Sequence, residues 1–143
     1  MILLTGRRVT DVRRITLAQI EKGVGIRFRE SKTDKLATPG WSAAMDEAII
    51  EIKARLHVDT KVLPFYLICN LAGHECSEGS LNQAMQRLRP KFKAAGLEPF
   101  QLRDIRAKYG TDHADGAKAL NHSNPATFRK HYKRRGDVIE PLK

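Results

Sequence analysis

Residues 3–12 read LLTGRRVTDV, and the chain changes from apolar to basic in the middle of this stretch. The pattern predicts the end of one helix, a tight turn at Thr5-Gly6 and a second helix that begins near Val9. Because the chain opens inside this motif, we expect further sequence upstream of it.

Two arginines, Arg7 and Arg8, follow the turn at once, and Asp11 lies one helical turn after Arg8. An acidic residue at this spacing can hold the stem of an arginine in place while its guanidinium group faces a phosphate. The stretch therefore predicts an anion-binding arginine near the start of the second helix.

Residues 15–39 alternate apolar and polar side chains around a Gly-Val-Gly step, which is typical of short antiparallel strands. Turns are predicted at residues 21–23 and 31–35, which places Lys32 at the tip of a hairpin. A flexible lysine at such a tip can reach into a groove or a cleft, although by itself it is weak support for any function.

Apolar residues at helical spacing predict helices over most of the remaining chain. Ser42 is a suitable N-cap for the first of them, and Pro90 is expected to bend the second. The predicted helices cover residues 43–57, 81–95, 101–113, 115–120 and 125–132. Residues 1–143 are therefore predicted to form one mainly helical α+β domain with a small antiparallel sheet.

The stretch FQLRDIRAKYGTD places Arg103 and Arg106 three residues apart, on the same face of a predicted helix. Two buried guanidinium groups on one face repel each other unless an anion lies between them. This pair is a second indication of an anion site.

Further along the chain, LNHS contains His122, and SNPATFRKHYKRRG contains Tyr132 ten residues later. A histidine and a tyrosine at this separation can meet across a short helix and turn. An amphipathic aromatic in a charged tail is the plainer reading of Tyr132, and without the other motifs it is the favoured one.

The chain carries 26 Lys and Arg residues against 16 Asp and Glu residues, which gives a net charge of +10. Most of the excess lies in residues 87–143, where 14 basic residues face 6 acidic ones. Such a surplus predicts affinity for polyanions, of which nucleic acid is the commonest. The alternative is a basic surface that is merely solvated.

The two cysteines, Cys69 and Cys76, are too few for a disulfide framework. No signal peptide or long apolar run is present, so we expect a cytoplasmic protein with no membrane partner. Together with His74 the cysteines form a C-x4-H-x-C pattern that superficially suggests zinc. A fourth ligand and the usual C-x2-C spacing are missing, so no metal site is predicted.

Taken in order, these motifs resemble the catalytic domain of the tyrosine recombinases, the phage integrase family. Thr5-Gly6-Arg7-Arg8 is similar to the family's Thr-Gly-x-Arg, and SKTDK is similar to the hairpin that carries its lysine. RDIRAK resembles the His-x-x-Arg box, LNHS resembles Leu-Gly-His-Ser, and TFRKHYKRRG resembles the nucleophile segment. The resemblance covers almost the whole chain.

The resemblance implies a site-specific DNA recombinase or integrase that cleaves and rejoins double-stranded DNA through a 3′-phosphotyrosyl intermediate. It implies no metal and no nucleotide cofactor, a nucleoid-associated protein of bacterial or phage origin, and other integrase protomers as partners in a synaptic complex. The residues that it assigns to catalysis are Arg8, Lys32, Arg103, Arg106, His122 and Tyr132, the last as nucleophile. The basic residues expected at the DNA backbone are Arg7, Arg129, Lys133, Arg134 and Arg135.

The chain departs from the family pattern in five respects. Only 16 residues separate Arg106 from His122, which indicates a trimmed helix or loop, and the interval from His122 to Tyr132 is one residue longer than usual. Arg103 stands where the family usually has histidine. Asn121 replaces a glycine, and asparagine tolerates left-handed backbone geometry. The family's N-terminal DNA-clamping domain is not in this sequence, so we expect a C-terminal part of a longer protein.

Two alternatives stay open at this point. The first is a catalytically impaired DNA-binding remnant of a prophage integrase, which keeps its basic surface but forms no covalent adduct with DNA. The second is a basic structural or RNA-binding module that only echoes the motifs, and it predicts that Arg8 and Arg106 lie far apart.

Overall fold

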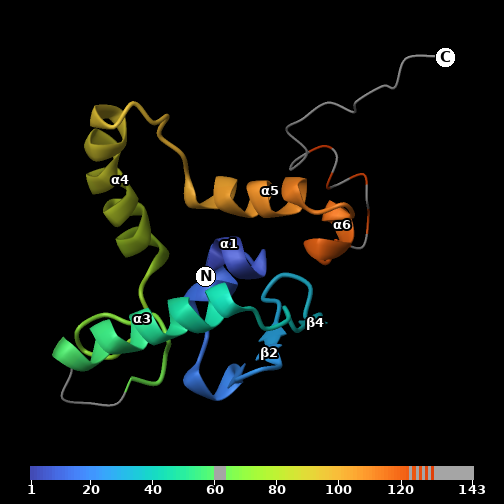
Figure 1. The fold of residues 1–143 in the computed structure, drawn as a ribbon, viewed down its shortest axis with the longest axis horizontal. Coiled ribbons are helices and arrows are strands. Elements are labelled where there is room, and N and C mark those ends of the chain that lie inside the picture. Colours follow the sequence, from blue (N-terminus) through green and yellow to red (C-terminus); the bar gives the residue numbers. More distant parts are fainter. Residues whose placement is uncertain (60–63, 123, 125, 127, 129, 131–143) are drawn as a thin grey trace.

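The computed structural model describes residues 1–59, 64–122, 124, 126, 128 and 130. Helices make up most of the regular structure in these residues, and short antiparallel strands lie beside them (Figure 1). The α+β prediction is therefore confirmed. Within the described ranges, no helix combines the length and the apolar character that a membrane crossing requires.

The N-terminal motif folds as the sequence predicts. Helix α1 (Ile2–Thr5) ends at Gly6, and helix α2 (Val9–Arg13) follows directly. Gly6 has a φ of 63°, a left-handed conformation that costs other residues about 1–2 kcal/mol. The ring of Tyr109 also packs so closely here that a Cβ atom on residue 6 would lie 2.3 Å from the Tyr109 Cδ1 atom. The turn therefore requires glycine for two reasons.

The predicted sheet is present as two separate two-stranded ladders. A 3-10 turn, η1 (Leu17–Gln19), precedes the pairing of β1 (Ile20–Glu21) with β2 (Gly25–Ile26), and β3 (Phe28–Arg29) pairs with β4 (Leu36–Ala37). Both pairs are antiparallel, as predicted. Their connecting turns fall at residues 22–24 and 31–33, close to the predicted positions.

Side chains leading up to the second hairpin alternate between the interior and the solvent. Ile26 and Phe28 are buried, whereas Arg27 and Arg29 are exposed. Successive residues of an extended chain point to opposite faces, so Glu30 shares the inward register of Phe28. It is indeed buried. The hairpin therefore delivers a carboxylate into the interior just before its tip.

The main hydrophobic core lies where α2, the hairpins and helix α3 (Ala43–Asp59) meet. Helix α3 contributes Met45 and Ile49, two residues of the face that its sequence predicts to be buried. The segment after residue 63 returns to this core, since the Leu67 amide donates a 2.8 Å hydrogen bond to the Ile15 carbonyl oxygen. The buried members of the core are Val12, Ile15, Ile26, Phe28, Met45, Ile49 and Leu67.

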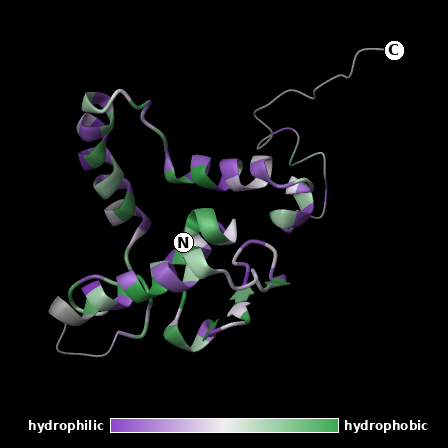
Figure 2. Cartoon of the chain, in the orientation of Figure 1, coloured by the Kyte–Doolittle hydropathy of each residue, from purple (hydrophilic) through white to green (hydrophobic). Residues whose placement is uncertain are grey.

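Helix α4 (Glu78–Ala94) begins at Ser77, whose hydroxyl accepts a 3.0 Å hydrogen bond from the Ser80 amide. The helix continues past Pro90, and none of its residues is buried. Figure 2 shows hydrophobic and hydrophilic residues mixed along it. The apolar residues of α4 are partly covered within the described residues, for example where the Phe92 ring stacks on Phe100 with ring centroids 5.1 Å apart.

Helix α5 (Leu102–Asp112) packs beside α1, and the short helix α6 (Gly116–Ala119) packs against α5 (Figure 1). Phe128, which is buried, fits against two glycines in this region. A Cβ atom on Gly110 would lie 2.8 Å from the Phe128 ring, and one on Gly116 would lie 2.3 Å from it. These glycines therefore let the segment after α6 fold back onto the helices.

Candidate active site

Arg106 joins two segments that are far apart in the chain at the centre of the candidate site. The side chain is buried on α5, and its Nη1 atom donates a 2.6 Å hydrogen bond to the Gly6 carbonyl oxygen. Its Nη2 atom donates a 3.0 Å hydrogen bond to the Leu120 carbonyl oxygen. Arg106 therefore fixes the N-terminal turn and the end of α6 in one place, although 114 residues separate Gly6 from Leu120.

Arg7 lies in the interior and not on the DNA-facing surface that the sequence analysis expects for it. Its exposed fraction is 3%. Its Nε atom donates to the Thr5 carbonyl oxygen at 3.1 Å, its Nη1 atom to Glu30 Oε1 at 2.6 Å, and its Nη2 atom to the Ala119 carbonyl oxygen. Since these three donors hold protein groups, Arg7 acts as a structural cross-link between the turn, the hairpin and α6.

Arg8, the adjacent residue, keeps 21% of its side chain exposed. Its Nη1 atom lies 2.9 Å from Glu30 Oε2 and 4.0 Å from Asp11 Oδ2. The predicted pairing with Asp11 is therefore present, but the shorter contact is with Glu30. Arg8 is held from one side and reaches the surface on the other.

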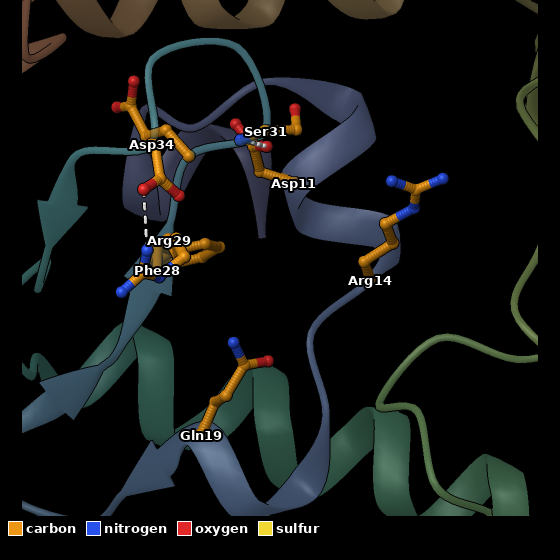
Figure 3. Close-up of a pocket in the computed structure, with 8 residues that line it drawn as sticks. Asp11, Arg14, Gln19, Phe28, Arg29, Ser31 and Asp34 are labelled. Atoms are coloured by element: carbon orange, nitrogen blue, oxygen red, sulfur yellow. Dashed lines mark hydrogen bonds and ion pairs between the residues drawn. The ribbon is translucent and has the colours of Figure 1, made fainter.

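Asp11 also binds the tip of the hairpin, as Figure 3 shows. Its Oδ1 atom accepts a 3.0 Å hydrogen bond from the Ser31 amide, beside a cavity of about 250 Å³. At the same cavity the hairpin is closed by a 2.7 Å ion pair between Arg29 and Asp34. The hairpin tip is therefore tied to α2 through Asp11.

Glu30 is the residue of the site that sequence reasoning missed. Its Oε1 atom accepts from Arg7 Nη1 at 2.6 Å and from Asn121 Nδ2 at 3.3 Å. Its Oε2 atom accepts from Arg8 Nη1 and from Thr33 Oγ1, both at 2.9 Å. The signal that could have found it is the strand register, which places this acid on the inward face after Phe28.

The ionisation of Glu30 follows from these contacts. Burial raises the pKa of its carboxyl, but hydrogen bonds from Arg8 and Thr33, with the charges of Arg8 and Arg7, outweigh burial and lower the pKa below its ordinary value of 4.5. Glu30 is therefore a carboxylate at neutral pH and offsets part of the positive charge of the site.

Lys32 occupies the hairpin tip, as predicted, and its side chain is exposed. Arg103 is exposed as well, whereas Arg106, three residues later on α5, is buried. The two arginines of this helix therefore do not form the buried pair that their spacing suggested. Lys32 and Arg103 both face solvent, where a bound molecule could reach them.

His122 follows a left-handed turn at Asn121, whose φ is 57°, as the asparagine in LNHS predicts. The His122 amide donates a 2.9 Å hydrogen bond to the Ala117 carbonyl oxygen, which holds the residue against the end of α6. Burial and the positive charges of Arg106 and Arg8 lower the pKa of His122 below its ordinary value of 6.5. Its imidazole is therefore neutral at pH 7 and can accept a proton.

The position of His122 also bears on the distance between the two arginines. Arg106 binds the carbonyl group of Gly6, two residues before Arg8, and the charges of both arginines act on His122. This arrangement does not fit a module in which Arg8 and Arg106 lie far apart.

The predicted nucleophile, Tyr132, lies outside the described residues. So do the expected DNA-backbone residues Arg129, Lys133, Arg134 and Arg135. Ahead of them, Ala126, Phe128 and Lys130 are helical, and the Asn124 side chain accepts a 2.8 Å hydrogen bond from the Ala126 amide. This capping bond agrees with the helix predicted after Asn124.

The cysteine and histidine pattern does not gather into a metal site. In the described part of the chain, no group of three or more His, Cys, Asp and Glu side chains could hold a metal ion. Cys69 and Cys76 are free thiols, and burial raises the pKa of each.

The chain resembles known proteins in its structure. No protein-family model and no curated protein sequence matches the chain. Among solved structures, XerA recombinase matches with a TM-score of 0.70 and 20% identity over 95% of this chain. XerH site-specific recombinase, bound to its palindromic difH substrate, matches with a TM-score of 0.72 and 20% identity over 94% of this chain. A lambda integrase dimer bound to a COC′ core site matches with a TM-score of 0.70 and 19% identity over 99% of this chain.

This chain spans 52%, 40% and 53% of the lengths of those three proteins, respectively. The match extends over nearly every residue of the chain. At about 20% identity it establishes the architecture and not the activity. The chain therefore has the fold of the tyrosine recombinase catalytic domain.

Proposed function

We propose that this chain is the catalytic domain of a site-specific DNA recombinase that cleaves and rejoins double-stranded DNA through a 3′-phosphotyrosyl intermediate. The observation that carries the proposal is the convergence of Arg8, Arg106 and His122 beside the hairpin of Lys32. Three separate parts of the chain supply these groups, and together they suit one phosphate.

The proposed reaction begins with attack of the Tyr132 oxygen on a DNA phosphorus atom. A bond forms between that oxygen and phosphorus, and the bond from phosphorus to the 5′ oxygen breaks. A tyrosine hydroxyl, with a pKa near 10, is mostly protonated at pH 7, so its proton must be taken up as it attacks. Neutral His122 is suited to accept it, and Lys32 is suited to protonate the leaving 5′ oxygen.

The arginines stabilise the charge that develops on the phosphate oxygens. In this proposal Arg8 binds one non-bridging oxygen through the exposed part of its side chain. Arg106 is buried, so it binds a second oxygen by exchanging one of its two carbonyl hydrogen bonds, and Arg103 assists from the exposed face of α5. Removing one donor of this kind costs on the order of 3 kcal/mol of transition-state stabilisation, roughly a hundredfold in rate. Since the energy of the broken bond is kept in the phosphotyrosine, a second DNA end can reseal the strand without a nucleotide cofactor.

Double-stranded DNA and further protomers are the partners in this proposal. The XerH and lambda integrase structures were solved as DNA complexes, and the lambda integrase as a dimer, which supports both partners. The basic residues Arg129, Lys133, Arg134 and Arg135 remain predicted backbone contacts. The cytoplasmic, nucleoid-associated location remains a prediction too.

The test is covalent trapping. Incubating the protein with nicked suicide DNA, in which the cleaved end diffuses away, should give a protein–DNA adduct that resists denaturation. Tyr132→Phe should abolish it, while the matched Tyr66→Phe variant should leave it intact, because both changes remove only a hydroxyl. An adduct that persists in Tyr132→Phe would exclude this nucleophile.

The impaired remnant is the alternative outcome of the same test. It predicts salt-dependent DNA binding with no adduct, because the 16-residue interval from Arg106 to His122 would misplace the histidine. The bond from Arg106 to the Leu120 carbonyl group supports the active reading, since it holds the shortened segment next to the arginine.

A further inference from the structure

Glu30 is a buried ionised side chain that the proposed reaction does not use. Its side chain has no exposed surface, and both carboxylate oxygens are engaged. Four donors converge on it: Arg7 and Asn121 at Oε1, and Arg8 and Thr33 at Oε2. Burying a charge is costly unless it is paired and hydrogen-bonded in this way, so the arrangement calls for an explanation.

The identity of these donors is the main observation. Arg8 is itself a proposed catalytic residue, Thr33 directly follows Lys32, and Asn121 directly precedes His122. These three donors come from the turn after α1, the hairpin tip and the turn after α6. One carboxylate is therefore bonded to three of the segments that carry a proposed catalytic group.

Electrostatics explains why a carboxylate is suited to this place. The guanidinium groups of Arg7, Arg8 and Arg106 are brought together in one small region, and like charges repel in a poorly solvated interior. Glu30 pairs with Arg7 in the interior, at 2.6 Å. It binds only the Nη1 atom of Arg8, whose side chain stays 21% exposed.

We propose that Glu30 is a positioning residue that sets the orientation of Arg8 toward the phosphate and aligns the Lys32 and His122 segments with it before DNA binds. This inference rests on the proposed function for its catalytic consequence. Its structural part, the ordering of the Arg8 guanidinium group by Glu30, can be measured without any reaction.

The first test compares single-turnover rates of adduct formation. Glu30→Gln replaces one carboxylate oxygen with an NH2 group, which cannot accept a hydrogen bond. The two donors that face this position therefore lose their acceptor. We expect the rate to fall by at least about tenfold, the effect of losing a hydrogen bond to a charged group. Glu21→Gln is the matched control, because Glu21 is an exposed carboxylate paired with Arg27 on the other hairpin, and its rate should equal that of wild type.

A double-mutant cycle separates positioning from general stabilisation. If Glu30 acts through Arg8, then Glu30→Gln should lower the rate much less in an Arg8→Ala background than in wild type. An undiminished effect in that background would overturn the proposal, and so would a wild-type rate in Glu30→Gln. If Glu30→Gln does not fold, Glu30→Asp replaces it, because it keeps the charge and shortens the reach. Adduct formation by Glu30→Asp should be several-fold slower than in wild type. A wild-type rate in this variant would also overturn the proposal.

The second test does not depend on activity. The side-chain 15N resonances of Arg8 report how fast its guanidinium group rotates, and they should show hindered rotation in wild type and Glu21→Gln but fast rotation in Glu30→Gln. Unchanged Arg8 resonances in Glu30→Gln would refute the positioning role. If wild type forms no adduct while these resonances change as expected, the proposed function fails and the positioning role stands.

Discussion

Arg106 on α5 donates a 2.6 Å hydrogen bond to the carbonyl oxygen of Gly6, one hundred residues earlier in the chain. A second bond from the same guanidinium group reaches the Leu120 carbonyl oxygen. The residue proposed to bind the phosphate is therefore also a structural bracket, and its substitution should affect stability and activity together.

Arg106→Lys tests this double role. Lysine has one amine in place of the planar fork, so it can hold one of the two carbonyl groups but not both. We expect a loss of about 1.5–3 kcal/mol in the free energy of unfolding, measured by urea denaturation, with a drop of at least about a hundredfold in adduct formation. Arg103→Lys changes an exposed residue on the same helix, so its free energy of unfolding should stay within about 0.5 kcal/mol of the wild-type value.

Gly6→Ala tests the turn. A Cβ atom there meets the Tyr109 ring at 2.3 Å and also forces a left-handed conformation on a residue other than glycine. We expect the free energy of unfolding to fall by at least about 2 kcal/mol. Gly23→Ala is the control, because its φ is +81° but nothing lies within 4 Å of the added atom. Gly23→Ala should lose only the backbone contribution to the free energy of unfolding, about 1–2 kcal/mol. Equal losses in both variants would exclude the Tyr109 contact as a cause.

Lys32→Ala tests the proton donor. The side chain is exposed on a turn, so the melting temperature should hardly change, while the cleavage rate falls by about a hundredfold. A DNA substrate with sulfur in place of the leaving 5′ oxygen should restore the rate, because a thiolate leaves without a proton. Failure of the sulfur substrate to rescue Lys32→Ala would assign the lysine another role.

Stability should depend on pH through Glu30. The pKa of this carboxyl is lower in the folded protein than its ordinary value of 4.5, so the folded state binds fewer protons than the unfolded state in this range. The stabilisation is complete above about pH 4.5 and is lost as the pH falls through the folded pKa. Urea denaturation from pH 7 to pH 3 should show this loss in wild type, and a much smaller loss in Glu30→Gln.

The effect of the surrounding charges on the pKa of His122 can be measured by NMR titration. Its pKa should lie below 6.5, because burial and the charges of Arg106 and Arg8 disfavour the protonated ring. In Arg8→Ala one positive charge is removed and Glu30 is less compensated, and both changes raise the pKa of His122. A His122 titration that does not move in Arg8→Ala would show that the two side chains are not electrostatically coupled.

Local signals in the sequence were sufficient for much of the fold. The Thr5-Gly6 turn, the hairpin around Lys32 and the left-handed Asn121 each depend on neighbours within a few residues, and the structure has all three. The same holds for the N-terminus of α3, where the apolar pattern and the Ser42 cap agree.

Local signals could not predict which of Arg7 and Arg8 is buried. The two arginines are identical and adjacent, so no local pattern decides which of them is buried. The Ala119 carbonyl group, 112 residues away, accepts from Arg7 and decides it. Arg103 was likewise paired with Arg106 from their spacing alone, although only the packing of α5 determines which arginine of that helix faces inward.

Glu30 was missed for a related reason. An acid in a basic, polar stretch is normally a solvated residue, and only the buried register of Ile26 and Phe28 distinguishes it. That register is visible in the sequence, but the partners that make burial of a charge tolerable come from distant segments.

The acceptors that Arg106 uses are main-chain carbonyl groups, which every type of residue carries, so no particular acceptor side chain is needed for these two hydrogen bonds. Likewise, Arg7 holds the carbonyl groups of Thr5 and Ala119. The geometry of the site therefore depends on the path of the backbone and on a few long basic side chains. A sequence can change widely around such an arrangement without moving it, which is consistent with a shared architecture at about 20% identity.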